Sequence, residues 1–429
     1  MRVLFVTYPA RTHFHHIVPV AWALRTAGHE VHVASGPELT DVITGAGLTA
    51  VAAGSDEPLR EKVNRFSETA NRTGFQIPDI GMAEDRPEML TLEKLKRYHS
   101  GLAEILKVQN DSMIEDLVAY GRWWKPDLVV WEWLSNAGPV VAAAVGAAQA
   151  RMSLIIEVDV RLRGHFLAAL ARQAPQDRED PVAEWVNGWG EKYGFAFSEE
   201  MFTGQFVIDQ MVPSLQLESA VPHVPVRYIP YNGQATVPEW CRAEPEKPRV
   251  LATFGVSMWS VMGDQLISTN RLQDMLDSMA DLDIELVLTL PERIEKRLRS
   301  IPGNTRIVPF VPLHAIVPSC SAVIHHGGIP GFSVSASHGV PQLMVSRAAP
   351  DADLRGGLLE KAQAGLWLAP EEMTGETLRD RLVRLLDDPA FRSGAGRLRE
   401  EMLAQPTPND AVAEIERLTD AQSRRKKER

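Results

Sequence analysis

Strand and helix signals alternate along the first 35 residues, and this order constrains the fold more than any other feature of the chain. Residues 3–6 form a short apolar run, residues 17–27 carry an apolar helical face that stops at Gly28, and Glu30–Ser35 has the pattern of a second strand. Further strand-like runs follow at residues 48–52, 128–131 and 151–156. Strands that alternate with helices in this way predict a parallel sheet with helices on both faces.

A second series of the same kind begins at Arg249, after a stretch from 213 to 248 in which proline is dense. Its strands are predicted at residues 250–255, 285–289, 305–310, 322–324 and 342–345. The predicted fold class is therefore α/β, with two doubly wound, Rossmann-like domains that face each other across a cleft. Ligands of such sheets bind at the carboxyl ends of the strands.

The composition shift at the prolines suggests how the chain divides. We expect an N-terminal domain over residues 1–225, a proline-rich linker over 226–248 and a C-terminal domain over 249–405. A final helix over 406–420 is a candidate to pack back on the N-terminal domain. The basic tail over 421–429 is expected to be a solvated end rather than a membrane or partner surface.

The composition excludes several classes of function. The formal net charge is −11, so the chain has no overall basic charge with which to neutralise nucleic-acid phosphates. The two cysteines, Cys241 and Cys320, do not lie in a metal-ligand pattern, which predicts a reduced, cytoplasmic protein without a zinc site. No apolar stretch approaches the roughly 18 residues of a membrane span, so neither export nor membrane insertion is expected.

A short stretch around His325 and His326 has the composition of an anion site. An apolar strand, 322–324, precedes the two histidines, two glycines follow them, and a helix is predicted from Phe332 to His338. The unpaired N–H groups and positive dipole end of a helix favour a phosphate, and a neighbouring histidine can donate a hydrogen bond to it. From this spacing alone, an ordinary strand-to-helix turn remains an equal alternative.

The loop that follows the first strand, residues 7–16, is the other expected functional position. It lacks a G-x-G-x-x-G pattern, which argues against a dinucleotide site. Histidines take the place of the glycines, and the candidates are His13, His15 and His16.

These regions together resemble the GT-B glycosyltransferases. The C-terminal half is similar to the family's nucleotide-sugar site in FVPLHAIVPSC, HHGG and HGVPQ, and the N-terminal half to its acceptor-side opening in THFHHIVPVAWALRTAGHEV. More narrowly, the chain resembles the actinobacterial transferases that place TDP-deoxysugars on polyketide antibiotics such as macrolides and anthracyclines, in PDLVVWE, REDPVAEW, YIPYNG and VPEW. The likeness spans nearly the whole chain and implies the GT-B fold.

The resemblance implies a donor site in the C-terminal half. His326 falls where the family binds the α-phosphate of the donor, with Gly327 and Gly328 allowing close approach of the backbone, and His325 is expected to be structural. The other implied positions are Val311, Pro312 and Leu313 at the nucleobase, Gly255 and Ser257 under the diphosphate, and Asp351 at the sugar hydroxyls.

The resemblance also implies a general base, at His13. An imidazole with a reference pKa near 6.5 can accept a proton from a hydroxyl while that oxygen attacks the anomeric carbon, and a single displacement inverts that carbon. Glu132, at the end of the LVVW strand, is the candidate that orients the base. Loop capping by His13, and a pocket-wall or salt-bridge role for Glu132, are the alternatives. His15 and His16 are the other candidate bases.

Two donor-side positions depart from the family pattern. Gly331 stands where the family often has Ser or Thr, so the hydroxyl expected at the β-phosphate is missing, and Ser333 is the candidate substitute. Ala352 follows Asp351 where the family often has Gln, which removes an amide for a sugar hydroxyl. A deoxysugar needs that amide less. The departures imply weak donor binding, an altered donor, or a transferase that needs an auxiliary protein for activity.

The leading interpretation is an inverting transferase that moves a deoxysugar from TDP to a hydroxyl of a hydrophobic polyketide-type acceptor, with no metal ion and no cofactor. Metal independence is expected because His326 and the positive end of the following helix would balance the charge of the diphosphate in place of a metal ion. The resemblance also implies a haem-monooxygenase-like auxiliary protein, for which the helical insertions around 57–120 and 173–205 are the expected docking surface. Two alternatives stay open, a catalytically silent scaffold subunit and a sugar-nucleotide epimerase of the same fold.

Overall fold

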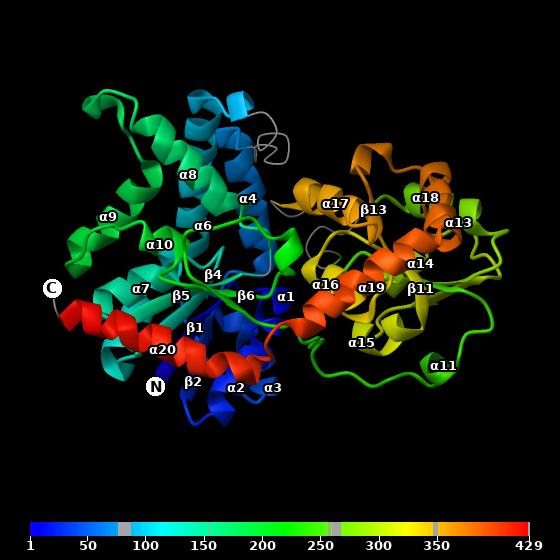
Figure 1. Cartoon of the computed structure of the whole chain (residues 1–429), viewed down its shortest axis with the longest axis horizontal. Helices are drawn as coiled ribbons and strands as arrows, with labels where there is room; N and C mark the ends of the chain where they lie inside the picture. The colour runs from blue at the N-terminus through cyan, green and yellow to red at the C-terminus, as the bar shows by residue number, and fades with distance from the viewer. Residues whose placement is uncertain (76–86, 154, 256–258, 260–266, 346–350, 428–429) are drawn as a thin grey trace. The chain divides into compact units, whose positions relative to one another are not determined.

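The computed structural model describes residues 1–75, 87–153, 155–255, 259, 267–345 and 351–427 (Figure 1). The chain forms two compact units. The first unit combines Met1–Met211, Gln216–Tyr231 and Gln405–Arg429, and the second combines Val212–Leu215 and Asn232–Ala404. Among the described residues, no helix has both the length and the apolar character that crossing a bilayer requires.

The first unit is built on a seven-stranded parallel sheet with the order β3-β2-β1-β4-β5-β6-β7. Its strands are β1 (Arg2–Val6), β2 (Glu30–Ser35), β3 (Thr49–Ala52), β4 (Leu128–Glu132), β5 (Ala148–Ser153), β6 (Val207–Asp209) and β7 (His223–Pro225). Its helices are α1 (Arg11–His15), α2 (Val18–Thr26), α3 (Thr40–Gly45), α4 (Leu59–Thr73), α6 (Leu92–Trp124), α7 (Ala137–Val145), α8 (Val158–Leu170), α9 (Pro181–Tyr193), α10 (Glu200–Thr203) and α20 (Pro408–Lys427). Every residue of β4 is buried, as expected for a central strand covered on both faces.

The last helix belongs to the core of this first unit. Ala411, Val412, Ile415 and Leu418 of α20 are buried in the same hydrophobic cluster as the side chains of β1 and α2. Figure 1 shows α20, in red, lying beside α2, and the two helices are in contact. The spacing of these four residues places them on one helical face, so the sequence encodes α20 as a covering helix.

The second unit is built on a six-stranded parallel sheet with the order β10-β9-β8-β11-β12-β13. Its strands are β8 (Arg249–Thr253), β9 (Glu285–Thr289), β10 (Thr305–Val308), β11 (Cys320–His325), β12 (Gln342–Val345) and β13 (Gly365–Leu368). Its helices are α11 (Glu239–Arg242), α13 (Thr269–Met279), α14 (Glu292–Glu295), α15 (Leu313–Ile316), α16 (Ile329–His338), α17 (Ala352–Lys361), α18 (Gly375–Asp387) and α19 (Pro389–Ala404). Both predicted parallel sheets are therefore confirmed.

Several predicted element bounds were wrong. The strand expected at 151–156 is β5, which begins three residues earlier, because the buried polar residues Gln149 and Arg151 hide its apolar pattern. The strands β6, β7 and β13 were not predicted, since runs of three or four residues carry too little periodicity. The helix expected from Phe332 begins at Ile329, with Pro330 in its first turn, where its missing N–H costs nothing.

Candidate active site

The strand order of the first unit changes direction at β1, whose neighbours are β2 and β4. Ligands of open parallel sheets bind outside the carboxyl ends of the strands at such a switch point. His13 lies in α1, which follows β1, and Glu132 is the last residue of β4. The topology therefore brings these two predicted residues to one place, and the Nδ1 atom of His13 lies 3.3 Å from Oε2 of Glu132.

The Glu132 carboxylate is buried and held by four partners. Its Oε1 atom accepts hydrogen bonds from the Tyr8 N–H at 2.9 Å and the Ser135 hydroxyl at 2.6 Å. Its Oε2 atom accepts one from the Leu134 N–H at 3.0 Å and faces His13. Burial raises the pKa of Glu132, but His13 and the hydrogen bonds outweigh this and lower the pKa to about 2. The carboxylate is therefore ionised at neutral pH.

An ionised carboxylate beside Nδ1 favours the tautomer of His13 that carries its proton there, so Nε2 keeps a free lone pair. The ring of Tyr8 packs edge-on against the imidazole, with 5.3 Å between ring centroids. Burial raises the pKa of the Tyr8 phenol, with a smaller contribution from Glu132, so this group stays neutral. A base with an orienting carboxylate is the arrangement that proton abstraction from a hydroxyl requires.

The other two histidines of this loop have different surroundings. Burial lowers the pKa of His15 to about 4 and that of His16 to about 3. The His15 ring packs edge-on against Tyr231, and Nδ1 of His16 lies 3.3 Å from the carbonyl oxygen of Thr12. These contacts place both rings in the packing of the loop.

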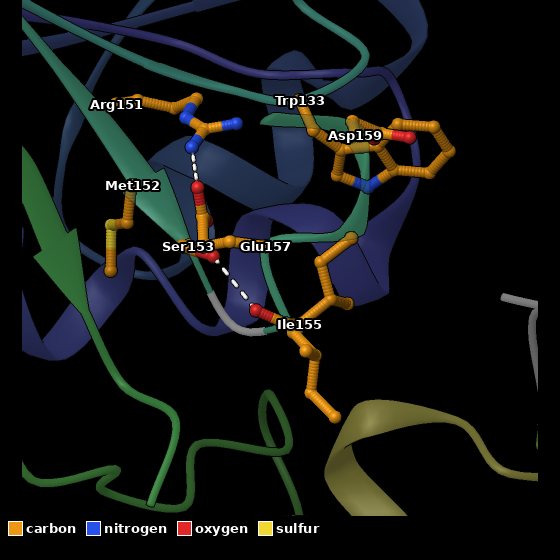
Figure 2. Close-up of a pocket in the computed structure, with 8 residues that line it drawn as sticks. Trp133, Arg151, Met152, Ser153, Ile155, Glu157 and Asp159 are labelled. Carbon is orange, nitrogen blue, oxygen red and sulfur yellow. Dashed lines mark hydrogen bonds and ion pairs between the residues drawn. The ribbon is translucent and has the colours of Figure 1, made fainter. Parts of the chain in front are cut away.

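A small pocket with both apolar and charged lining lies beside the His13–Glu132 pair, at the carboxyl end of β5 (Figure 2). Arg151 and Glu157 point towards each other there and form a buried ion pair. Trp133, the residue after Glu132, lines the same pocket. Its volume of about 10 Å³ is room for about one water molecule. Neither Arg151 nor Glu157 was predicted as functional, because Arg151 lies inside β5 and Glu157 beyond its end, and the sequence gives no sign that the two meet.

The second unit has its own switch point, at β8, whose neighbours are β9 and β11. Gly255 follows β8, and the His325–His326 pair follows the apolar run of β11. His325 is fully buried; its Nδ1 accepts the Gly327 N–H at 3.0 Å, and its Nε2 lies 2.8 Å from Oε1 of Gln342. Burial lowers its pKa to about 3, so His325 is a neutral support for the loop.

The imidazole of His326 lies between two glycines. A Cβ atom on Gly255 would come within 2.5 Å of its Cε1 atom, and a Cβ on Gly328 within 2.5 Å of its Nε2 atom. Real Cβ atoms do not approach other atoms so closely, so a side chain at either position would displace the imidazole. Gly255 and Gly327 also have φ values of +79° and +76°, which favour glycine. Burial lowers the pKa of His326 to about 4, which makes it a neutral hydrogen-bonding group.

The helix α16 begins directly after this loop, with Gly328 as its N-cap residue. The free N–H groups of its first turn and its dipole favour an anion at this end. Gly331 lies in that turn, and a Cβ atom there would sit 3.2 Å from Cβ and Cγ of His325. The helix backbone at Gly331 therefore lies so close to His325 that a serine or threonine side chain would fit there only tightly.

Behind the loop lies a buried arginine that sequence reasoning missed. Arg355 is fully buried, its Nη2 donates to the carbonyl oxygen of Gly327 at 2.7 Å, and its Nε lies 3.2 Å from Oδ2 of Asp351. The guanidinium also covers the ring of Phe332, 5.0 Å from its centroid. The sequence feature that could have predicted this ion pair is the spacing of Asp351 and Arg355, which lie four residues apart at the start of a helix.

The remaining predicted donor residues are placed as follows. Val311 is buried, Pro312 is the N-cap residue of α15, Leu313 begins that helix, and Ser333 is buried inside α16. Asp351 is buried against Arg355. Ser257 lies outside the described residues.

Both halves of the chain match models of one protein family. Residues 22–255 match the model of the N-terminal domain of erythromycin biosynthesis protein CIII-like proteins, and residues 273–418 match that of their C-terminal domain. The chain is 44% identical to 10-deoxymethynolide desosaminyltransferase of Streptomyces venezuelae, over 99% of this chain and 98% of that protein. It is 42% identical to aclacinomycin-T 2-deoxy-L-fucose transferase of Streptomyces galilaeus, over 98% and 96%.

Solved structures of glycosyltransferases match the fold of this chain over almost its whole length. The glycosyltransferase VinC, in complex with dTDP, has a TM-score of 0.86 and 34% identity, covering 98% of this chain and 100% of that one. Spinosyn forosaminyltransferase SpnP has a TM-score of 0.81 and 35% identity, covering 98% and 99%. The chain belongs to the erythromycin biosynthesis protein CIII-like family of GT-B glycosyltransferases.

Proposed function

We propose that this enzyme is an inverting transferase that moves a deoxysugar from TDP to a hydroxyl of a polyketide aglycone. The observation that carries the proposal is the His13–Glu132 pair, a histidine with one free ring nitrogen and an ionised, fully hydrogen-bonded carboxylate behind it. A scaffold subunit would not need such a pair. The relatives described above are named as sugar transferases, which gives no support to a scaffold or an epimerase.

In the proposed reaction, Nε2 of His13 takes the proton of the acceptor hydroxyl as its oxygen attacks the anomeric carbon. The bond between that carbon and the diphosphate oxygen breaks, and TDP leaves with the electron pair. Glu132 stabilises the imidazolium that forms. General base catalysis of this kind contributes typically 10²- to 10⁴-fold in rate.

The donor half of the proposal assigns the diphosphate to His326 and to the amino end of α16. Hydrogen bonds from the imidazole and the first-turn N–H groups would stabilise the charge that develops on the leaving TDP, so the transfer is proposed to need no metal ion or cofactor. Residues 311–313 are assigned to the nucleobase, whereas Asp351, predicted at the sugar, is fully buried in its ion pair with Arg355 and is given no ligand.

A haem-monooxygenase-like auxiliary protein remains part of the proposal. Its support is the resemblance of the chain to transferases that work with such a protein, and the helices α4, α6 and α9 are assigned as its docking surface. Turnover measured with and without the auxiliary protein tests this part.

The proposed function is tested by a donor and an acceptor measurement on the same preparation. Thermal shift titrations with TDP, UDP and ADP should show a TDP-selective rise in Tm. Turnover is then followed by mass spectrometry with two pairs that relatives of the chain are named for, TDP-desosamine with 10-deoxymethynolide and TDP-rhodosamine with aklavinone. TDP binding without product from any pair, with or without the auxiliary protein, would favour the scaffold.

A further inference from the structure

Lys62, in α4, is a buried lysine whose amine has no partner among the described residues. Only 2% of the residue is exposed, whereas lysine is almost never fully buried unless it is paired. Neither a hydrogen bond nor an ion pair is formed by its Nζ atom within the described part of the chain. Burial lowers its pKa, and Glu38 offsets this only in part. The carboxylate of Glu38 accepts the Leu59 N–H, at 3.0 Å.

The Lys62 amine lies at the edge of the sheet where the catalytic pair was found. A Cβ atom on Gly36 would be 3.5 Å from Nζ of Lys62 and 3.2 Å from Cβ of Pro9. Gly36 directly follows β2, and Pro9 lies between β1 and α1, the helix that carries His13. The amine therefore sits beside the loops at the carboxyl ends of β1 and β2, where an open parallel sheet binds its ligand.

An ammonium group that keeps little contact with water and donates no hydrogen bond within the described residues is unfavourable for folding, since most of its hydration is lost without compensation. Such a cost is commonly retained where a ligand supplies the missing partner. The partner must be an oxygen acceptor that reaches the edge of the first unit. Polyketide aglycones carry ketone and hydroxyl oxygens besides the one that receives the sugar, so they supply this chemistry.

We propose that Lys62 is an acceptor-binding residue whose buried amine, beside the loops after β1 and β2, donates a hydrogen bond to a second oxygen of the aglycone. This inference rests on the proposed function. Lys62 then fixes how the aglycone lies relative to His13, and so helps to select which hydroxyl is glycosylated.

The test compares Lys62→Met with Arg60→Met. Methionine keeps the length and volume of the lysine stem without its charge, and Arg60 is an exposed cation on the same helix. Equilibrium binding of 10-deoxymethynolide and of aklavinone is measured by quenching of tryptophan fluorescence, and TDP binding by calorimetry. We expect Lys62→Met to weaken aglycone binding roughly tenfold or more, as for loss of a charged hydrogen bond, with unchanged TDP affinity and an equal or higher Tm. Arg60→Met should behave as the wild type.

Three results would overturn the inference. Aglycone affinity within twofold of the wild type in Lys62→Met would show that the amine does not contact the acceptor, while turnover by the wild type would leave the proposed function standing. A lower Tm with equal weakening of TDP and aglycone binding would make Lys62 a structural residue. Binding of TDP but of neither aglycone by the wild type would reject the acceptor class and, with it, the role of Lys62.

Discussion

Arg355 donates a hydrogen bond to the carbonyl oxygen of Gly327, at 2.7 Å. The N–H of the same glycine donates to Nδ1 of His325, at 3.0 Å. Both polar groups of this one residue are thus held by buried side chains, in a backbone conformation, φ +76°, that favours glycine. The loop that presents His326 and the start of α16 is therefore held rigidly before any donor arrives, which reduces the ordering cost of binding.

Arg355→Met should weaken TDP binding roughly tenfold and lower the free energy of unfolding by about 3 kcal/mol, because it leaves the buried Asp351 carboxylate without its cation. Calorimetry with TDP and denaturant unfolding measure the two effects. Combining it with Asp351→Asn should recover part of the stability but not the TDP affinity. Recovery of both together would mean that Arg355 contributes only to stability.

His13→Ala should lower kcat by roughly 10²- to 10⁴-fold, because the general base is lost, while TDP affinity stays at the wild-type value. Glu132→Gln should also lower kcat, since the amide no longer stabilises the imidazolium. Steady-state turnover and TDP calorimetry separate chemistry from donor binding. A normal kcat for His13→Ala would remove His13 from the reaction.

The depressed pKa of Glu132 predicts a pH dependence of stability. Its folded-state pKa is about 2, against an ordinary value of 4.5, so its contribution is present above about pH 4.5 and is lost as the pH falls towards 2. The difference between these values corresponds to about 3 kcal/mol. Denaturant unfolding of the wild type and of Glu132→Gln between pH 7 and 3 checks this. The two stabilities should converge as the pH falls; a constant difference would contradict the shifted pKa.

Gly328→Ala should abolish TDP binding by displacing the imidazole of His326, since the added Cβ would meet its Nε2 atom. Gly328 has a φ of −63°, which alanine adopts without strain, so the effect comes from the clash alone. Gly357→Ala is the matched control in the same unit, because nothing lies within 4 Å of its added Cβ. TDP calorimetry on both variants decides; equal affinities would show that the position of His326 is unimportant.

Turnover should be unchanged after dialysis against EDTA, because the amino end of α16 and His326 are proposed to balance the diphosphate charge. The measurement is the initial rate before dialysis, after dialysis, and after Mg²⁺ is restored. A rate that falls on dialysis and returns with Mg²⁺ would require a metal ion in the donor site.

Local patterns predicted much of the fold. The strands β2, β9 and β12 were predicted with the bounds that they have, because each is a short apolar run next to turn residues. The contact between His13 and Glu132 could also be predicted, since parallel strands bring their carboxyl ends to one edge of a sheet. The start of α16 was predicted three residues too late, since the helix begins at Ile329 and holds Pro330 in its first turn, where proline is tolerated.

The supporting residues could not be predicted in the same way. Arg355 and Lys62 are charged residues on helices, and a helical pattern usually puts such residues in water. Their burial depends on which loops and strands meet above them, and this is decided by tertiary packing. Arg151 in β5 is the same case, since its partner Glu157 lies beyond the end of the strand.

The helix α20 has a consequence for how the protein is made. It is translated after the whole of the second unit, yet its residues Ala411, Val412, Ile415 and Leu418 complete the core of the first. The unit that leaves the ribosome first therefore completes its core last. Part of that hydrophobic core stays uncovered while about 170 further residues are synthesised. Chaperone demand during synthesis should accordingly fall on the N-terminal half.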